Sequence, residues 1–211
     1  MDLRLSGKVA VVTGASKGIG LAVTQALAAE GVNVVAVARG ITGPLTDLAP
    51  RVHPVSADLT TADGPASVVE EAVSRFGGLD ILVNNVGAVH PRLAGFASVT
   101  DDDWIQALTV TNFCKALSKE VGPRGVRVNT VSPGPVSTSL WLGDDGVAAT
   151  VAKASGGSPE DIARSAAAQS ATGRFSLPQE VADLVLLLAG DRAGNVTGSD
   201  FVIDGGLVQT L

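Results

Sequence analysis

Tyrosine is absent from this chain, and cysteine occurs only once, at Cys114. A single cysteine excludes an internal disulfide and suits a reducing compartment, so we expect a cytoplasmic protein. The formal net charge is −6, and the sequence contains no run of lysine or arginine. Both features disfavour nucleic acid and anionic membranes as partners. No window reaches the roughly 18 apolar residues of a membrane span, and the first five residues do not begin a signal peptide.

Short β-branched runs alternate with longer segments of helical pattern. The expected strands are Val9–Val12, Val32–Val37, Val52–Ala57, Ile81–Val83, Val126–Val131 and Phe201–Ile203. The expected helices are Leu21–Glu30, Ala66–Phe76, Asp102–Val121 and Pro178–Leu188. Most of the strands are apolar on both faces, as in a parallel sheet with helices on both sides. The pattern therefore predicts a single α/β domain over residues 1–211 with a doubly wound parallel sheet.

One stretch, Gly143–Gly157, is rich in glycine, alanine and serine and is expected to be flexible. Because it follows a strand end, it is either a lid over a ligand cleft or a plain surface loop. Leu140, Trp141 and Leu142 just before it would give such a lid an apolar wall, or would pack against their own domain.

A glycine-rich turn joins the first strand to the first helix. It runs from Thr13 to Gly20 and contains Gly14, Ser16, Lys17, Gly18, Ile19 and Gly20. Glycines allow a tight turn and a close approach to a pyrophosphate, and the following helix offers unpaired N–H groups to the phosphates. The turn is not a P-loop, since its lysine precedes the final glycines. We therefore expect a dinucleotide site.

The end of the second strand indicates which dinucleotide is bound. An acidic residue there would bind the ribose 2′-OH of NAD, whereas an arginine would accept a 2′-phosphate. This chain has Arg39 and no carboxylate there, and Lys17 faces the same pocket. Arginine binds phosphate bidentately, so NADP(H) is favoured over NAD(H). The alternative is that Arg39 is only a solvated loop charge.

Six motifs in order resemble the short-chain dehydrogenase/reductase family, over nearly all of residues 5–206. After the glycine turn come Asp58-Leu59, Asn84-Asn85-Val86-Gly87, Pro133-Gly134-Pro135-Val136-Ser137-Thr138, Gly173-Arg174-Phe175 with Pro178–Ala182, and Val202–Gly206. The resemblance implies a Rossmann-like fold. It also implies adenine contacts from Asp58 and Leu59, ribose-side contacts from Asn85 and Gly87, and nicotinamide contacts from Pro133, Gly134, Val136 and Thr138. Asn84 is expected to brace the sheet.

The family's catalytic serine and Tyr-x-x-x-Lys motif have no counterpart here. Asp101–Val110 resembles the first half of one family helix, and Thr111–Glu120 resembles the second half of the next. We place the junction between Val110 and Thr111. By comparison with family members of usual size, the missing piece would be about 40–55 residues and would include a central strand.

No replacement catalyst is visible in the sequence. The residues considered were His90, Asn112, Cys114, Lys115, Lys119 and Ser132. A catalytic group must come within hydrogen-bond reach of the reacting oxygen, and nothing places these residues so. Lys115 and Lys119 are more simply a solvated helix face, His90 an exposed loop residue and Cys114 a small core residue. No catalytic residue and no metal ligand is therefore assigned.

Two explanations of the junction stay open. Either the natural molecule contains the segment, or the chain runs directly from Val110 to Thr111 and 102–121 form one helix. In the second case the sheet would lose a central strand, and the helices that cover this strand would expose apolar surface. The resemblance implies an NADP(H)-dependent oxidoreductase acting on a small carbonyl or alcohol. The alternatives are a catalytically dead nucleotide-binding or interaction protein, and a truncation that never folds well. A homo-oligomer is possible, with its interface in doubt.

Overall fold

The computed structural model describes residues 1–87 and 101–208, with the backbone alone over 101–109. The chain divides into two compact units. Unit 1 consists of Met1–Ala88 and Pro178–Arg192, and unit 2 consists of Val89–Leu177 and Ala193–Leu211.

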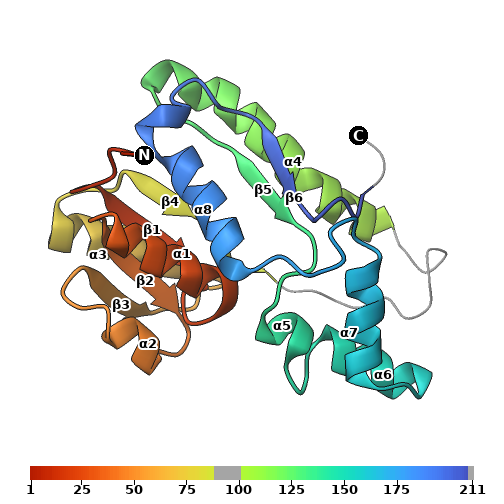
Figure 1. The fold of residues 1–211 in the computed structure, drawn as a ribbon. Coiled ribbons are helices and arrows are strands. Elements are labelled where there is room, and N and C mark those ends of the chain that lie inside the picture. The colour runs from red at the N-terminus through yellow and green to blue at the C-terminus, as the bar shows by residue number, and fades with distance from the viewer. Residues whose placement is uncertain (88–100, 209–211) are drawn as a thin grey trace. The chain divides into compact units, whose positions relative to one another are not determined.

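Unit 1 is built on a four-stranded parallel sheet with the order β3-β2-β1-β4 (Figure 1). Its strands are β1 (Val9–Thr13), β2 (Asn33–Ala38), β3 (Val52–Ser56) and β4 (Ile81–Val83). β1 and almost all of β2 are buried, because their alternating side chains meet helices on both faces of the sheet. This burial explains why the two strands are apolar runs without alternation.

Helices cover both faces of this sheet. They are α1 (Gly18–Ala29), α2 (Gly43–Thr46), α3 (Gly64–Phe76) and α8 (Pro178–Ala189), followed by the 3-10 turn η3 (Asp191–Ala193). One core cluster joins α1 and α8 to one face through residues such as Val12, Leu27 and Leu186. A second cluster joins α3 to the other face through Val11, Val35, Val68 and similar residues. Both clusters lie within unit 1.

Unit 2 holds a short parallel pair of strands, β5 (Thr130–Pro133) and β6 (Asp200–Ile203). Its helices are α4 (Asp101–Val121), the 3-10 turn η2 (Gly122–Arg124), α5 (Ser139–Leu142), α6 (Val147–Ser155) and α7 (Pro159–Ala168). Its buried apolar side chains are few and mostly small, as at Ala148, Ala149 and Ala152 on α6. Of the helices in the described ranges, none is long and apolar enough to cross a membrane.

The expected helices are all present, and residues 102–121 lie within one uninterrupted helix, α4, across Val110 and Thr111. The α/β parallel architecture is confirmed, although the strands form two sheets instead of one. Two expectations were wrong. The fifth strand begins at Thr130 and not at Val126, because β6 pairs only with Thr130–Pro133. The supposedly flexible stretch 143–157 contains α6, whose buried alanines pack in place of a mobile loop.

Several large apolar side chains of the described residues are exposed. Val11 and Leu82 are register partners on β1 and β4 and point to the α3 face of the sheet. Val11 is 1% exposed, whereas Leu82 is 55% exposed. In the described part of the chain no strand pairs with the outer side of β4. Phe113 on α4 and Val202 on β6 are exposed as well.

This difference predicts unequal costs of truncation at two neighbouring positions. Val11→Ala is expected to lower the free energy of unfolding by about 1–3 kcal/mol, because it opens a cavity in a packed cluster. Leu82→Ala removes more carbon atoms but is expected to cost less than about 1 kcal/mol, because that side chain is largely in water already. Urea denaturation of both variants measures this. A cost of about 2–5 kcal/mol for Leu82→Ala would show that a further element covers β4.

Candidate cofactor site

The glycine turn adopts the backbone that its sequence predicts. Gly14 and Gly18 have φ values of +65° and +57°, in the left-handed region that glycine tolerates best. Gly20 lies so close to the turn that a Cβ there would collide with the carbonyl oxygen of Gly14, and would come within 2.6 Å of Nδ2 of Asn85. The start of α1 is therefore packed directly against the turn, which only a glycine at position 20 permits.

The hydroxyl of Thr13 holds this turn to β4. It is 4% exposed and accepts hydrogen bonds from the backbone N–H groups of Asn85 (2.9 Å) and Val86 (3.3 Å), and it donates to the carbonyl oxygen of Val83 (3.4 Å). The side-chain amide of Asn85 donates back to the carbonyl oxygens of Thr13 (3.2 Å) and Gly14 (3.4 Å). The described bracing bonds thus come from Asn85, whereas Asn84 is exposed. A cofactor contact by Asn85 stays a prediction.

The N-terminus of α1 suits an anion. Its N-cap residue, Lys17, makes no side-chain hydrogen bond to the first turn, and no acidic residue occupies that turn. The first N–H groups of a helix lack partners within the helix and carry a partial positive charge. Ser16 and Ile19 flank this end half-buried, with Ile19 packed on the α1 side of the core. The residues present therefore fit the phosphates of a dinucleotide.

Exposed cations lie at the end of β2 and at the start of α1. Arg39 and Lys17 are both exposed, and within the described ranges neither forms a salt bridge with a carboxylate. The backbone N–H and hydroxyl of Thr60 hold the pKa of Asp58 below its ordinary value, with a smaller contribution from the charge of Arg39. Asp58 is therefore a carboxylate at neutral pH.

Two other predicted contacts of unit 1 differ in their surroundings. Leu59 is half-buried against the α3 side of the core, so packing accounts for part of its apolar character. Gly87 is exposed, and a Cβ there would meet none of the described atoms within 4 Å. Packing against those atoms does not require glycine at position 87. A ligand contact at either position stays a prediction.

The predicted nicotinamide segment lies in unit 2, at and after the end of β5. A Cβ on Gly134 would lie 2.7 Å from Cβ of Asp204, so close packing on the Asp204 loop already requires glycine there. Val136 is buried and pairs with Ser176, and Thr138 begins α5 without capping it through its hydroxyl. Pro133 is exposed at the end of β5. Nothing in these contacts tests a cofactor role.

The structure does not bring together the residues that were considered as replacement catalysts. Ser132 donates to the carboxylate of Asp200 (2.8 Å), and Lys115 donates to the carbonyl oxygen of Gly198 (2.7 Å). Lys115 and Lys119 are both exposed on α4, as expected of a solvated helix face, although Lys115 also contacts the turn at Gly198. Asn112 is exposed as well. Cys114 is half-buried and not a core residue. His90 lies outside the described residues.

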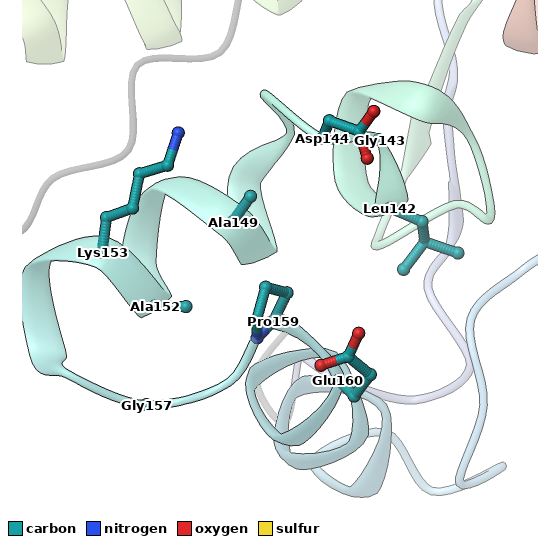
Figure 2. Close-up of a pocket in the computed structure, with 9 residues that line it drawn as sticks. All are labelled: Leu142, Gly143, Asp144, Ala149, Ala152, Lys153, Gly157, Pro159 and Glu160. Carbon is teal, nitrogen blue, oxygen red and sulfur yellow. The ribbon is translucent and has the colours of Figure 1, made fainter.

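A pocket of about 340 Å³ lies among α5, α6 and α7 (Figure 2). Its lining is mixed, with Leu142, Ala149 and Pro159 beside the charged Lys153, Asp144 and Glu160. Trp141 points elsewhere and packs edge-on against Phe175, with ring centroids 5.1 Å apart. The two expectations for this apolar segment are each met by one residue. Trp141 packs within its own unit, whereas Leu142 lines the pocket. In the described part of the chain, no group of three or more histidine, cysteine, aspartate or glutamate side chains is placed to hold a metal ion.

Comparisons with known proteins agree on one family. The short chain dehydrogenase profile matches residues 8–113, and the Enoyl-(Acyl carrier protein) reductase profile matches residues 108–208. The 3-alpha-(or 20-beta)-hydroxysteroid dehydrogenase of Mycobacterium tuberculosis is 31% identical over 266 aligned positions, covering 100% of this chain and 93% of that protein. The 3-oxoacyl-[acyl-carrier-protein] reductase of Thermotoga maritima is 28% identical over 268 positions, covering 98% of this chain and 100% of that protein.

Solved structures give the same result. L-sorbose reductase from Gluconobacter frateurii, complexed with NADPH and L-sorbose, superposes with a TM-score of 0.86 at 30% identity, with both chains covered completely. A short-chain dehydrogenase/reductase from Serratia marcescens superposes with a TM-score of 0.75 at 29% identity, covering 96% of this chain and 98% of that one.

The contacts of Thr13 predict a specific loss of stability. Thr13→Val keeps the side-chain shape but leaves the N–H groups of Asn85 and Val86 without their acceptor. We therefore expect it to lower the free energy of unfolding by about 1–3 kcal/mol. Thr13→Ser keeps the hydroxyl and is expected to retain most of that stability. Chemical denaturation compares the three proteins. Equal stability of Thr13→Val and the unaltered chain would contradict the bracing role.

Proposed function

Because this chain belongs to the short-chain dehydrogenase/reductase family of oxidoreductases, we propose that it binds NADP(H) through the glycine turn of unit 1. We further propose that hydride exchange with a small carbonyl or alcohol substrate depends on the segment missing after Val110. Lineage thus supports an oxidoreductase, whereas the residues present support cofactor binding.

The observation that carries the choice of cofactor is the pair of exposed cations, Arg39 and Lys17, with no carboxylate directly after β2. A 2′-phosphate at that place would be neutralised by a guanidinium capable of two hydrogen bonds. A 2′-hydroxyl would instead leave two charges without a counter-ion. The NADPH complex of the related L-sorbose reductase supports the same choice.

The residues of this chain would orient the cofactor in two places. The turn from Gly14 to Gly20 and the start of α1 would hold the pyrophosphate, and Asp58 and Leu59 would contact the adenine. Pro133, Gly134, Val136 and Thr138 would hold the nicotinamide carboxamide. When bound, NADPH supplies a hydride for a carbonyl carbon, and the carbonyl oxygen then needs a proton from the protein. Because the family's catalytic serine and Tyr-x-x-x-Lys motif have no counterpart in the sequence, we propose that this chain lacks the donor of that proton.

Three observations support a real loss of sequence at the junction. The alignment with the M. tuberculosis relative runs over 266 positions, whereas the chain has 211 residues, so that relative has a stretch without counterpart here. The two family profiles overlap at residues 108–113, on either side of Val110 and Thr111. The continuous α4 is the local structure that a direct join produces. These points favour a nucleotide-binding protein without turnover as the second candidate function.

The remaining proposals are broader. The single cysteine suits a cytoplasmic location, and the one-domain organisation over residues 1–211 is proposed from the order of the motifs. The substrate would be a small carbonyl or alcohol with some apolar bulk, since Leu142 lines the pocket among α5, α6 and α7. A homo-oligomer is compatible with the exposed Phe113 on α4, the helix in which the family's two helix halves meet.

Replacing Arg39 tests the choice of cofactor. Arg39→Ala is expected to weaken NADPH binding about tenfold or more, because a charge-assisted phosphate contact is lost, and to leave NADH binding nearly unchanged. Arg51→Ala is the matched control, since Arg51 is also exposed but donates to the carbonyl of Gly31 just before β2. Fluorescence titration with both cofactors measures the affinities. Equal losses for NADPH and NADH would contradict recognition of the 2′-phosphate.

Restoring the missing segment tests the proposed division between binding and chemistry. The stretch of the M. tuberculosis relative that has no counterpart here is inserted between Val110 and Thr111. We expect the graft to oxidise NADPH in the presence of a ketone panel, because it returns a proton donor. The same graft with its tyrosine replaced by phenylalanine is the control and should bind NADPH without oxidising it. A graft that folds, binds NADPH and shows no turnover would contradict the proposal.

A further inference from the structure

The segment that carries Arg39 is attached to the glycine turn at both of its ends. We call Ala38–Thr42 the ribose loop. Just before it, the carbonyl oxygen of Val37 accepts the N–H of Ala15 at 3.0 Å. At its far end the hydroxyl of Thr42 donates to the carbonyl oxygen of Ser16 at 3.3 Å, across 26 positions of sequence. The loop therefore cannot move away from the turn without breaking one of these bonds.

Thr42 uses its hydroxyl in an unusual way for its position. It is the N-cap residue of α2, where a threonine side chain ordinarily accepts a hydrogen bond from the first turn of its own helix. Here the side chain makes no such bond, and only the backbone carbonyl of Thr42 accepts, from the N–H groups of Leu45 (3.0 Å) and Thr46 (3.4 Å). The hydroxyl is directed instead to Ser16, one residue before Lys17. Its contact thus serves the turn and not α2.

The backbone of the ribose loop is also held from β3. The hydroxyl of Ser56 donates to the carbonyl oxygen of Arg39 at 3.0 Å, and the N–H of Ala57 donates to the carbonyl oxygen of Ala38 at 3.2 Å. The Arg39 side chain itself stays exposed. Because the backbone of Arg39 is fixed while its side chain is exposed, the guanidinium can contact a ligand only within a limited volume around the loop.

We propose that Thr42 is a positioning residue for the 2′-phosphate of NADP(H). Its bond to Ser16 holds the backbone of Arg39 and that of Lys17 at a set separation, so that both cations address one phosphate. The inference rests on the proposed function, because it presumes that these two cations recognise a 2′-phosphate. A 2′-hydroxyl gains little from that separation, so Thr42 discriminates between the two cofactors without touching either.

The test compares NADPH and NADH dissociation constants for three variants. Thr42→Val removes the donor at nearly constant shape and is expected to weaken NADPH binding about threefold to tenfold, with NADH changed less than about twofold. Thr42→Ser retains the donor and should keep the preference of the unaltered chain. Thr46→Val is the matched control, because its hydroxyl donates to the carbonyl of Gly43 within α2 and not to the glycine turn.

The outcomes separate this inference from the proposed function. If the unaltered chain does not prefer NADPH, the proposed function fails. If it prefers NADPH and Thr42→Val retains the same NADPH-to-NADH ratio, the role of Thr42 fails alone. Equal weakening of both cofactors by Thr42→Val would also overturn the inference, since it would show a general loosening of the turn. The effect of Thr46→Val on the ratio should be nil.

Discussion

The glycine turn of unit 1 depends on one buried residue, Thr13, whose hydroxyl holds it to the neighbouring strand. This hydroxyl joins the end of β1 to the segment after β4 by accepting two backbone N–H groups and donating to a carbonyl. Asn85 returns two bonds to the turn, and Gly20 seats α1 against it. These contacts all lie within unit 1, so the turn keeps its geometry without any residue of the missing segment. This geometry agrees with the proposal that the chain binds the cofactor without the family's catalytic segment.

The distribution of apolar side chains fits this separation. Both core clusters belong to unit 1, where four parallel strands are covered on two faces. Unit 2 has a two-stranded sheet, and such a pair is marginal without packing on a helix or further strands. Leu82 and Val202 remain exposed on their respective strands. We infer that stability is concentrated in unit 1.

Much of the fold was predictable because its signals are local. The apolar run of β1, the glycine turn and the Pro178 helix start each specify their own structure, and all were found near their predicted bounds. The start of β5 was not predictable, because a strand needs a partner and β6 is only four residues long. The contact of Thr42 was missed for a similar reason, because its hydroxyl donates to a residue 26 positions away and no spacing in the sequence reveals such a pair. The candidate site was predicted as a set of motifs, and its bracing contacts came only from the structure.

We propose that this chain binds NADP(H) and lacks the group that donates a proton to the substrate oxygen. A single-turnover experiment tests this proposal most directly: NADPH is first bound to an excess of the protein, its binding is verified by fluorescence, and a saturating ketone is then added. The bound NADPH is expected to stay reduced over many minutes. Stoichiometric oxidation of the bound NADPH would contradict the proposal, because this chain would then contain a proton donor.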